Sequence, residues 1–101
     1  WQPDVPPHPF VYRAGIIEVP MLSEYTWYLR EEDFERHYAL IQSDFDRVQQ
    51  VGGAFVTLSH YYAMTGEWAT GLRVYERLFA YARERGARFC TLSEVVRAFA
   101  A

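Results

Sequence analysis

The sequence predicts an α/β fold built on a parallel sheet. Between residues 15 and 101, three short apolar runs alternate with three stretches of helical periodicity. Strands and helices in this order form right-handed βαβ units, in which the strands run parallel and the helices cover the faces of the sheet. The second and third runs are almost continuously apolar, which is typical of strands buried on both faces.

The N-terminal residues 1–14 are predicted to form an extended connector that joins no sheet. These residues contain four of the five prolines. Proline lacks the backbone N–H that helices and β-ladders need. The run "IIEV" at 16–19 lies between Gly15 and Pro20, as expected of a short strand with defined ends. The next residues, "MLSEYTWYL", are expected to form an aromatic loop.

A long helix is predicted from Glu31 to Val51. Apolar residues recur there every three or four positions, at Phe34, Tyr38, Ile41, Phe45 and Val48. This spacing places them on one side of an α-helix. The acidic residues at the start suit the positive end of the helix dipole, and Gly52 with Gly53 provides an ending.

The rest of the chain repeats the pattern. "AFVTLS" at 54–59 is predicted to be the second strand, and a second helix is expected from about Gly71 to Arg85. "RFCTL" at 88–92 is then predicted to be the third strand. Ser93 is expected to cap a closing helix. Residues 15–101 therefore form one βαβαβα unit, and the whole chain is a single partial domain.

Composition excludes several classes of partner. The chain has 101 residues, half of them hydrophobic, with a formal net charge of −3 and arginines interspersed with acids. No cationic stripe for nucleic acid is present. Cys90 is the only cysteine, so a disulfide framework within the chain is excluded. No apolar run approaches the length of a membrane span, so the chain is expected to be soluble. The sequence does not identify its cellular compartment.

A site is expected where the parallel strands end, because sites in such sheets form at the carboxyl ends of the strands. Glu18 lies near the end of the first strand, and Ser59 and His60 follow the second. We expect the Glu18 carboxylate and the His60 imidazole at one rim. The plain alternatives are a histidine bonded to a loop carbonyl and an ion pair between Glu18 and Arg13.

Aromatic residues make up 18% of the chain and gather around the expected site. They are Trp27, Tyr28, Tyr61, Tyr62 and Trp68. Flat rings with a polar edge suit sugars, which present C–H groups and hydroxyls together. Trp27, Tyr61 and Trp68 are therefore candidates for substrate binding, although such rings also close the ends of barrels.

These segments together resemble a known family. "GIIEVP", then "GGAFVTLSH", then "GLRVYERLFAYARERGARFCTLSEVV" is similar to the C-terminal third of polysaccharide deacetylase-like domains. The most specific piece is an apolar run that ends in Leu58-Ser59-His60. The resemblance implies the C-terminal part of a distorted (β/α) barrel. It also implies a metal-dependent hydrolase that removes acetyl groups from N-acetyl sugars, a role in carbohydrate metabolism.

The resemblance also implies residue roles. Leu58 would help to line the pocket for the acyl methyl group, and His60 would be the general acid that protonates the leaving amine. By position, Glu18 would stand for the acid that favours protonated His60, and Trp27 for the aromatic wall. The family's usual aspartate motif is not matched literally in this sequence.

The family's metal-binding and base motifs have no counterpart in these residues. The resemblance therefore implies a divalent metal ion, with zinc as the first choice. The ion would be held by a missing N-terminal part of the domain, supplied by the same polypeptide or by another chain. The chain alone is expected to be inactive, and its open strand edges favour pairing with other chains, including copies of itself. The alternatives are a glycan-binding or interaction module without catalysis, and a hydrolase of the same fold that acts on cyclic amides.

Overall fold

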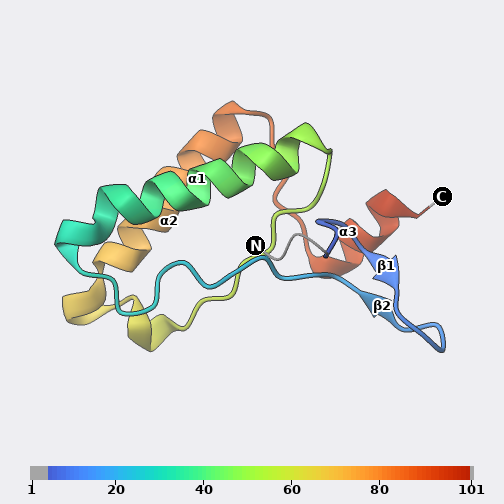
Figure 1. Cartoon of the computed structure of the whole chain (residues 1–101), viewed down its shortest axis with the longest axis horizontal. Coiled ribbons are helices and arrows are strands. Elements are labelled where there is room, and N and C mark those ends of the chain that lie inside the picture. Colours follow the sequence, from blue (N-terminus) through green and yellow to red (C-terminus); the bar gives the residue numbers. More distant parts are fainter. Residues whose placement is uncertain (1–4, 101) are drawn as a thin grey trace.

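The computed structural model of the chain describes residues 5–100, and these are mostly helical (Figure 1). Its elements in chain order are β1 (Phe10–Val11), β2 (Ile17–Glu18), the 3-10 helix η1 (Glu31–Asp33), α1 (Phe34–Gln50), the 3-10 helices η2 (Tyr61–Ala63) and η3 (Gly66–Trp68), α2 (Thr70–Glu84) and α3 (Leu92–Phe99). The prediction of a parallel βαβαβα segment of a barrel is therefore wrong.

The sheet among residues 5–100 consists of two antiparallel strands, β1 and β2. Phe10 lies opposite Glu18, and Val11 lies opposite Ile17. Ala14 and Gly15, with φ angles of 51° and 75°, turn the chain back tightly, so "IIEV" pairs with the residues just before it. The expected connector thus contains a strand, and its residues 1–4 lie outside the described part of the chain.

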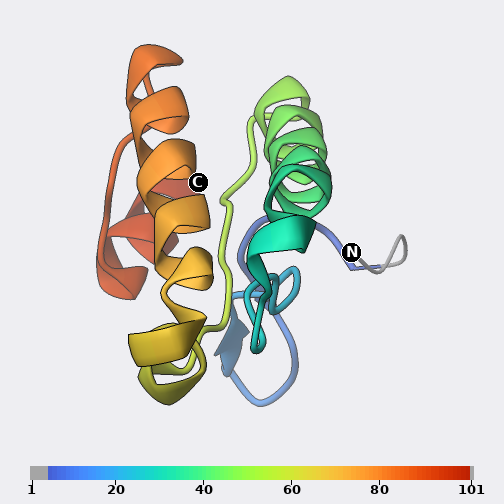
Figure 2. The same cartoon turned by 90° about the vertical axis from the view of Figure 1, so that its left-hand side faces the viewer.

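The two other apolar runs form no strand. Residues 54–60 are extended and run between α1 and α2 (Figure 2). They contact the loop after β2 through one parallel bridge, Ser23 with Thr57. Two backbone hydrogen bonds flank it, from Leu22 N to Val56 O at 2.7 Å and from Leu58 N to Ser23 O at 3.2 Å. Residues 88–91 join no ladder, because no neighbouring strand lies beside them in the described chain.

The two long helices match their predictions. The predicted helix from Glu31 to Val51 corresponds to η1 followed by α1, and the second corresponds to α2. Gly52 and Gly86 follow them with φ angles of 67° and 80°. A left-handed residue after the last turn is the usual helix ending, and glycine adopts it without strain.

The core lies between α1, α2 and the loop before η1. Its buried residues are Tyr25, Leu29, Tyr38, Ile41, Phe45, Val74, Tyr75, Leu78 and Ala82. Side-chain contacts also join the two helices at their surface. Arg77 bonds Glu35 at 2.9 Å and covers the Tyr38 ring, while the Tyr81 hydroxyl donates to Asp46 at 2.6 Å. This helix pair is the rigid support for the segments that cross it.

The closing helix α3 begins two residues earlier than predicted. Its N-cap is Thr91 rather than Ser93, because the Thr91 and Glu94 side chains exchange hydrogen bonds with each other's backbone N–H groups. Such a reciprocal capping box satisfies two donors that a helix start leaves open. No residue of α3 is buried.

Candidate functional site

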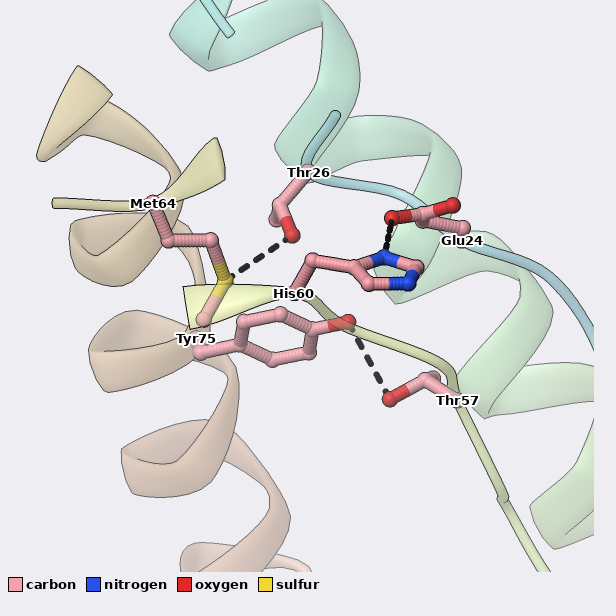
Figure 3. A network of polar contacts seen from close by, with 6 residues as sticks. All are labelled: Glu24, Thr26, Thr57, His60, Met64 and Tyr75. Atoms are coloured by element: carbon pink, nitrogen blue, oxygen red, sulfur yellow. Dashed lines mark hydrogen bonds and ion pairs between the residues drawn. The ribbon is translucent and has the colours of Figure 1, made fainter. Parts of the chain in front are cut away.

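A histidine and a carboxylate meet at one end of the helix pair. The Nδ1 atom of His60 lies 2.7 Å from Oε1 of Glu24 (Figure 3). Because a carboxylate only accepts, Nδ1 carries the proton and donates it in this bond. The His60 and Glu24 side chains are 36% and 23% exposed, so the pair is partly shielded and still reachable from solvent.

The parallel bridge explains why these two residues meet. Ser23 and Thr57 lie side by side, and the Leu58 N–H donates to the Ser23 carbonyl. The two extended segments run in the same direction, so the residues that follow the bridge in each segment also approach one another. Glu24 follows one bridging residue, and His60 comes three positions after the other.

The predicted pairing of His60 with Glu18 is replaced by its pairing with Glu24. Glu18 lies in β2, where it is exposed and opposite Phe10. The turn that pairs β2 with β1 places this carboxylate in the hairpin, so it does not meet His60. Arg13, the other suggested partner of Glu18, lies over the ring of Tyr12. Glu24 is the only acid in residues 20–30, but nothing local in the sequence pairs it with His60.

Aromatic rings surround the His60 imidazole. The Trp27 ring meets it edge to face at 5.4 Å between centroids, and the Tyr62 ring lies 5.3 Å away. Further ring contacts extend the group from Trp27 to Tyr28, from Tyr28 to Trp68 and from Tyr62 to Tyr61. We call these five residues, Trp27, Tyr28, Tyr61, Tyr62 and Trp68, the aromatic rim. All but Trp68 are exposed, so the rim presents ring surface to solvent beside His60.

The structure brings together most of the residues singled out in the sequence. His60 contacts Trp27 directly, and Tyr61 and Trp68 are joined to the same rim through other tyrosines. Leu58 is exposed, and its backbone N–H takes part in the bond that aligns the two segments. Glu18 is the one predicted site residue that lies elsewhere.

Tyr28 adopts a backbone conformation that bulky residues avoid. Its φ angle is 45°, in the left-handed region. A non-glycine residue there costs about 1–3 kcal/mol and persists only where neighbours enforce it. The next residue, Leu29, is buried in the core, and the Tyr28 ring contacts the rings of Trp27 and Trp68.

Two partly buried hydrogen bonds hold the segments that carry the pair. The Thr26 hydroxyl donates to the sulfur of Met64 at 3.0 Å, which joins the Glu24 loop to the end of η2. The Tyr75 hydroxyl of α2 donates to Thr57 at 3.1 Å, which fixes the segment leading to His60 (Figure 3). The candidate site therefore rests on the core of the helix pair.

The arrangement suits proton transfer. With Nδ1 bonded to a carboxylate, the ring is held in one tautomer and orientation, and Nε2 is the atom available to a reacting group. A carboxylate beside an imidazole also stabilises the imidazolium when it forms. A histidine in this setting can act as general acid or general base.

The described residues do not assemble a metal site. No group of three or more His, Cys, Asp or Glu side chains lies close enough together in residues 5–100 to hold an ion. Glu24 and His60 alone provide two donors, fewer than the three protein ligands of a catalytic zinc site. The implied metal thus does not fit the residues that the structure describes.

No known family model, curated protein or solved structure matches the chain. Within residues 5–100, no helix combines the length and the apolar character needed to cross a bilayer.

Proposed function

We propose that this chain supplies the acid half of a site that hydrolyses the acetamide of N-acetyl sugars. The observation that carries the proposal is the 2.7 Å bond between His60 and Glu24 beside an exposed aromatic rim. The chain's resemblance to the C-terminal part of polysaccharide deacetylase-like domains also supports it, through Leu58-Ser59-His60. The base and the metal implied by that resemblance would come from residues outside this chain.

The proposed role of His60 follows from the leaving group. When an amide is hydrolysed, the amine leaves readily only if its nitrogen is protonated as the C–N bond breaks. His60 in its imidazolium form would give its Nε2 proton to that nitrogen. Glu24 accepts the Nδ1–H bond throughout, so it orients the ring and stabilises the charged form before the transfer. His60 is the catalytic residue in this scheme, and Glu24 is a positioning residue.

The aromatic rim supplies a reason to expect a sugar. Trp27 stands edge-on to the imidazole, and Tyr62 flanks the same ring. Ring faces pack against the C–H groups of a pyranose, while phenol hydroxyls bond its hydroxyl groups. A sugar stacked on the rim would therefore lie within reach of Nε2.

The test is deacetylation by the full polypeptide that carries this chain, with zinc and an N-acetylated chito-oligosaccharide supplied and acetate release measured. His60→Ala should lower kcat by about 10²–10⁴-fold, the usual contribution of a general acid. His8→Ala is the matched control, because His8 lies before β1 and its ring stacks on Phe99 of α3. Activity of His60→Ala within twofold of wild type would reject the proposal.

Glu24→Gln separates positioning from catalysis. The amide keeps an acceptor for Nδ1 but removes the charge that stabilises the imidazolium. We expect kcat to fall less than in His60→Ala, with little change in KM, because the imidazole that gives the proton is still present. A loss of activity that accompanies a loss of cooperative unfolding would show that Glu24 only supports the local structure.

A second candidate is a glycan-binding module without catalysis, and the exposure of the rim favours it. Tyr61 is 78% exposed and Trp27 is 50% exposed, which is a large solvent-facing ring surface for so small a chain. Titration of the 101-residue chain with N-acetylchitotriose, followed by tryptophan fluorescence, tests this reading. Binding that Trp27→Ala abolishes and His60→Ala leaves intact, without acetate release from the full polypeptide, would favour the module.

A further inference from the structure

The outer edge of β2 is open. In an antiparallel pair, opposite residues alternate between those that exchange hydrogen bonds and those that do not. The Tyr12 N–H donates to Ile16 O at 2.8 Å, so the next pair, Val11 with Ile17, is a pair without mutual bonds. The backbone N–H and C=O of Ile17 therefore point away from β1. Among residues 5–100, no backbone group bonds them there.

One face of the hairpin beside this edge is apolar. Ile17 is 47% exposed and Val11, which faces the same side, is 68% exposed. The run 16–19 contains no proline, whereas β1 directly follows Pro9, and the neighbouring His8 ring stacks on Phe99 of α3. A two-stranded hairpin is marginal in water and gains stability from further strands. Of the two outer edges, the edge of β2 is the more accessible to another strand.

The chain exposes more surface than a compact monomer of its size. Its accessible surface is 6891 Å² at a mass of 11.9 kDa, against about 5,900 Å² expected for a folded monomer of that mass. Part of the difference lies on exposed apolar side chains of the hairpin, such as Val11 and Ile17. The radius of gyration, 14.4 Å, likewise exceeds the roughly 13 Å expected for a domain of 100 residues. Figure 1 shows the hairpin at one end of the long axis, beside α3.

We propose that this edge binds a second copy of the same chain. Two β2 strands would pair antiparallel about a two-fold axis that passes between their Ile17 residues and would form a four-stranded sheet. On one face, Val11 and Ile17 of one copy would continue into Ile17 and Val11 of the other as one apolar row. Burial of that row and the pairing of the Ile17 backbone groups drive the association.

The edge is complementary to itself, which favours a second copy over an unrelated strand. In a two-fold interface, each residue must tolerate the residue that symmetry places opposite it. Ile17 lies opposite Ile17, and Glu18 lies opposite Ile16, so no like charges stand directly across from each other. This association involves neither His60 nor Glu24, so its test is independent of the test of the proposed function.

Sedimentation equilibrium of the 101-residue chain tests the proposal. The wild type should show a concentration-dependent rise from monomer to dimer mass between about 10 µM and 1 mM. Ile17→Lys should weaken dimerisation at least about 100-fold. It removes the two isoleucines that the dimer would bury and places two charges at the two-fold axis. Leu40→Lys is the matched control, because it replaces a similarly exposed aliphatic residue on α1. A wild type that stays monomeric at 1 mM would overturn the proposal, as would dimerisation of Ile17→Lys at wild-type strength.

A cross-linking experiment reports the register of the pair. Residues that exchange hydrogen bonds across an antiparallel pair have Cα atoms about 5.5 Å apart, within the range of a disulfide. In a Cys90→Ser background, Ile17→Cys should give a covalent dimer with oxidised glutathione, and Leu40→Cys should not. Equal cross-linking of the two variants would contradict the proposed register even if the chain dimerises.

Discussion

The two ends of the molecule differ in how they are held together. The helix pair encloses the core, with Ile41 and Val74 fully buried between α1 and α2. The other end, formed by β1, β2 and α3, has no buried residue in any of its elements. Burial of apolar side chains dominates stability. The helix pair should therefore carry the stability of the chain, while the hairpin end is available for association.

The candidate site belongs to the stable end. His60 ends the extended segment, which runs between the helices (Figure 2). Its neighbour Tyr62 lies in η2, whose Ala63 is fully buried. Glu24 precedes the buried Tyr25 and Thr26. Groups that must meet at hydrogen-bond distance are best placed on such support.

The largest effect is expected from the core. Ile41→Ala removes a side chain with 0% exposure and should lower the free energy of unfolding by about 2–5 kcal/mol. Leu92→Ala on α3, where the side chain is 59% exposed, should change it by less than about 0.5 kcal/mol. Urea unfolding followed by circular dichroism measures both. Similar losses for the two variants would disprove the division.

A smaller loss is expected where α2 approaches the site. A Cβ atom on Gly71 would lie 3.0 Å from Cβ of Thr26, 3.2 Å from its carbonyl oxygen and 3.3 Å from Cγ of Met64. Gly71→Ala gains up to about 1 kcal/mol of helix propensity, but Thr26 is buried and cannot yield easily. Overpacking costs about 1–3 kcal/mol. We expect a net loss of stability, measured by the same unfolding experiment.

The companion double variant identifies the cause of that loss. Met64→Ala should open space beside residue 71, so Gly71→Ala should cost less in the Met64→Ala background than in the wild type. If the two changes add without interaction, the contact with Met64 does not determine the cost. A stabilised Gly71→Ala would mean that the loop carrying Thr26 moves aside without penalty.

The sequence predicted those elements whose signal is local. The three-and-four spacing from Phe34 to Val48 and the glycine after each long helix gave α1 and α2 nearly to the residue. The parallel sheet failed because strand pairing depends on distant partners. β-branched residues make "AFVTLS" extended, but nothing local decides whether a neighbouring strand lies beside it. The turn at Ala14 and Gly15, a more local signal, gave "IIEV" an antiparallel partner instead.

The candidate site divides in the same way. His60 and Trp27 were found because they follow apolar or aromatic runs, and they do meet. The carboxylate was assigned to Glu18, because that acid lies inside an apolar run. The actual partner, Glu24, is selected by a single bridge between Ser23 and Thr57, which no local pattern reveals.

Alkaline pH should destabilise the helix pair. Burial, with the hydrogen bond to Asp44, raises the pKa of Tyr25, and the hydrogen bond to Asp46 raises that of Tyr81. A raised pKa in the folded state means that the stabilisation is complete below the ordinary tyrosine pKa of 10.0 and is lost as pH rises beyond it. Each such tyrosine should increase the unfolding constant by up to tenfold per pH unit in that range.

Unfolding in urea at pH 9 and pH 11 measures this loss. Tyr25→Phe should reduce the difference in stability between the two pH values, because it removes one of the responsible hydroxyls. Tyr61→Phe, at an exposed position of the aromatic rim, is the control and should leave the difference unchanged. Equal behaviour of the two variants would show that burial of Tyr25 does not govern the alkaline response.

Low pH should destabilise the start of α3, and this is the smallest and most local of the expected effects. The Thr91 backbone N–H donates to Glu94 at 2.9 Å and lowers the pKa of that carboxyl below its usual 4.5. The capping contribution is therefore present above pH 4.5 and is lost as pH falls below it. Since no residue of α3 is buried, the capping box is a main restraint on its first turn. Glu94→Ala should speed amide exchange in α3 about twofold to fivefold at pH 6 and leave α1 unchanged. Ser93→Ala is the control, because it removes a neighbouring hydroxyl that does not cap the helix. Exchange as fast as in Glu94→Ala would show that Ser93, and not Thr91, is the N-cap.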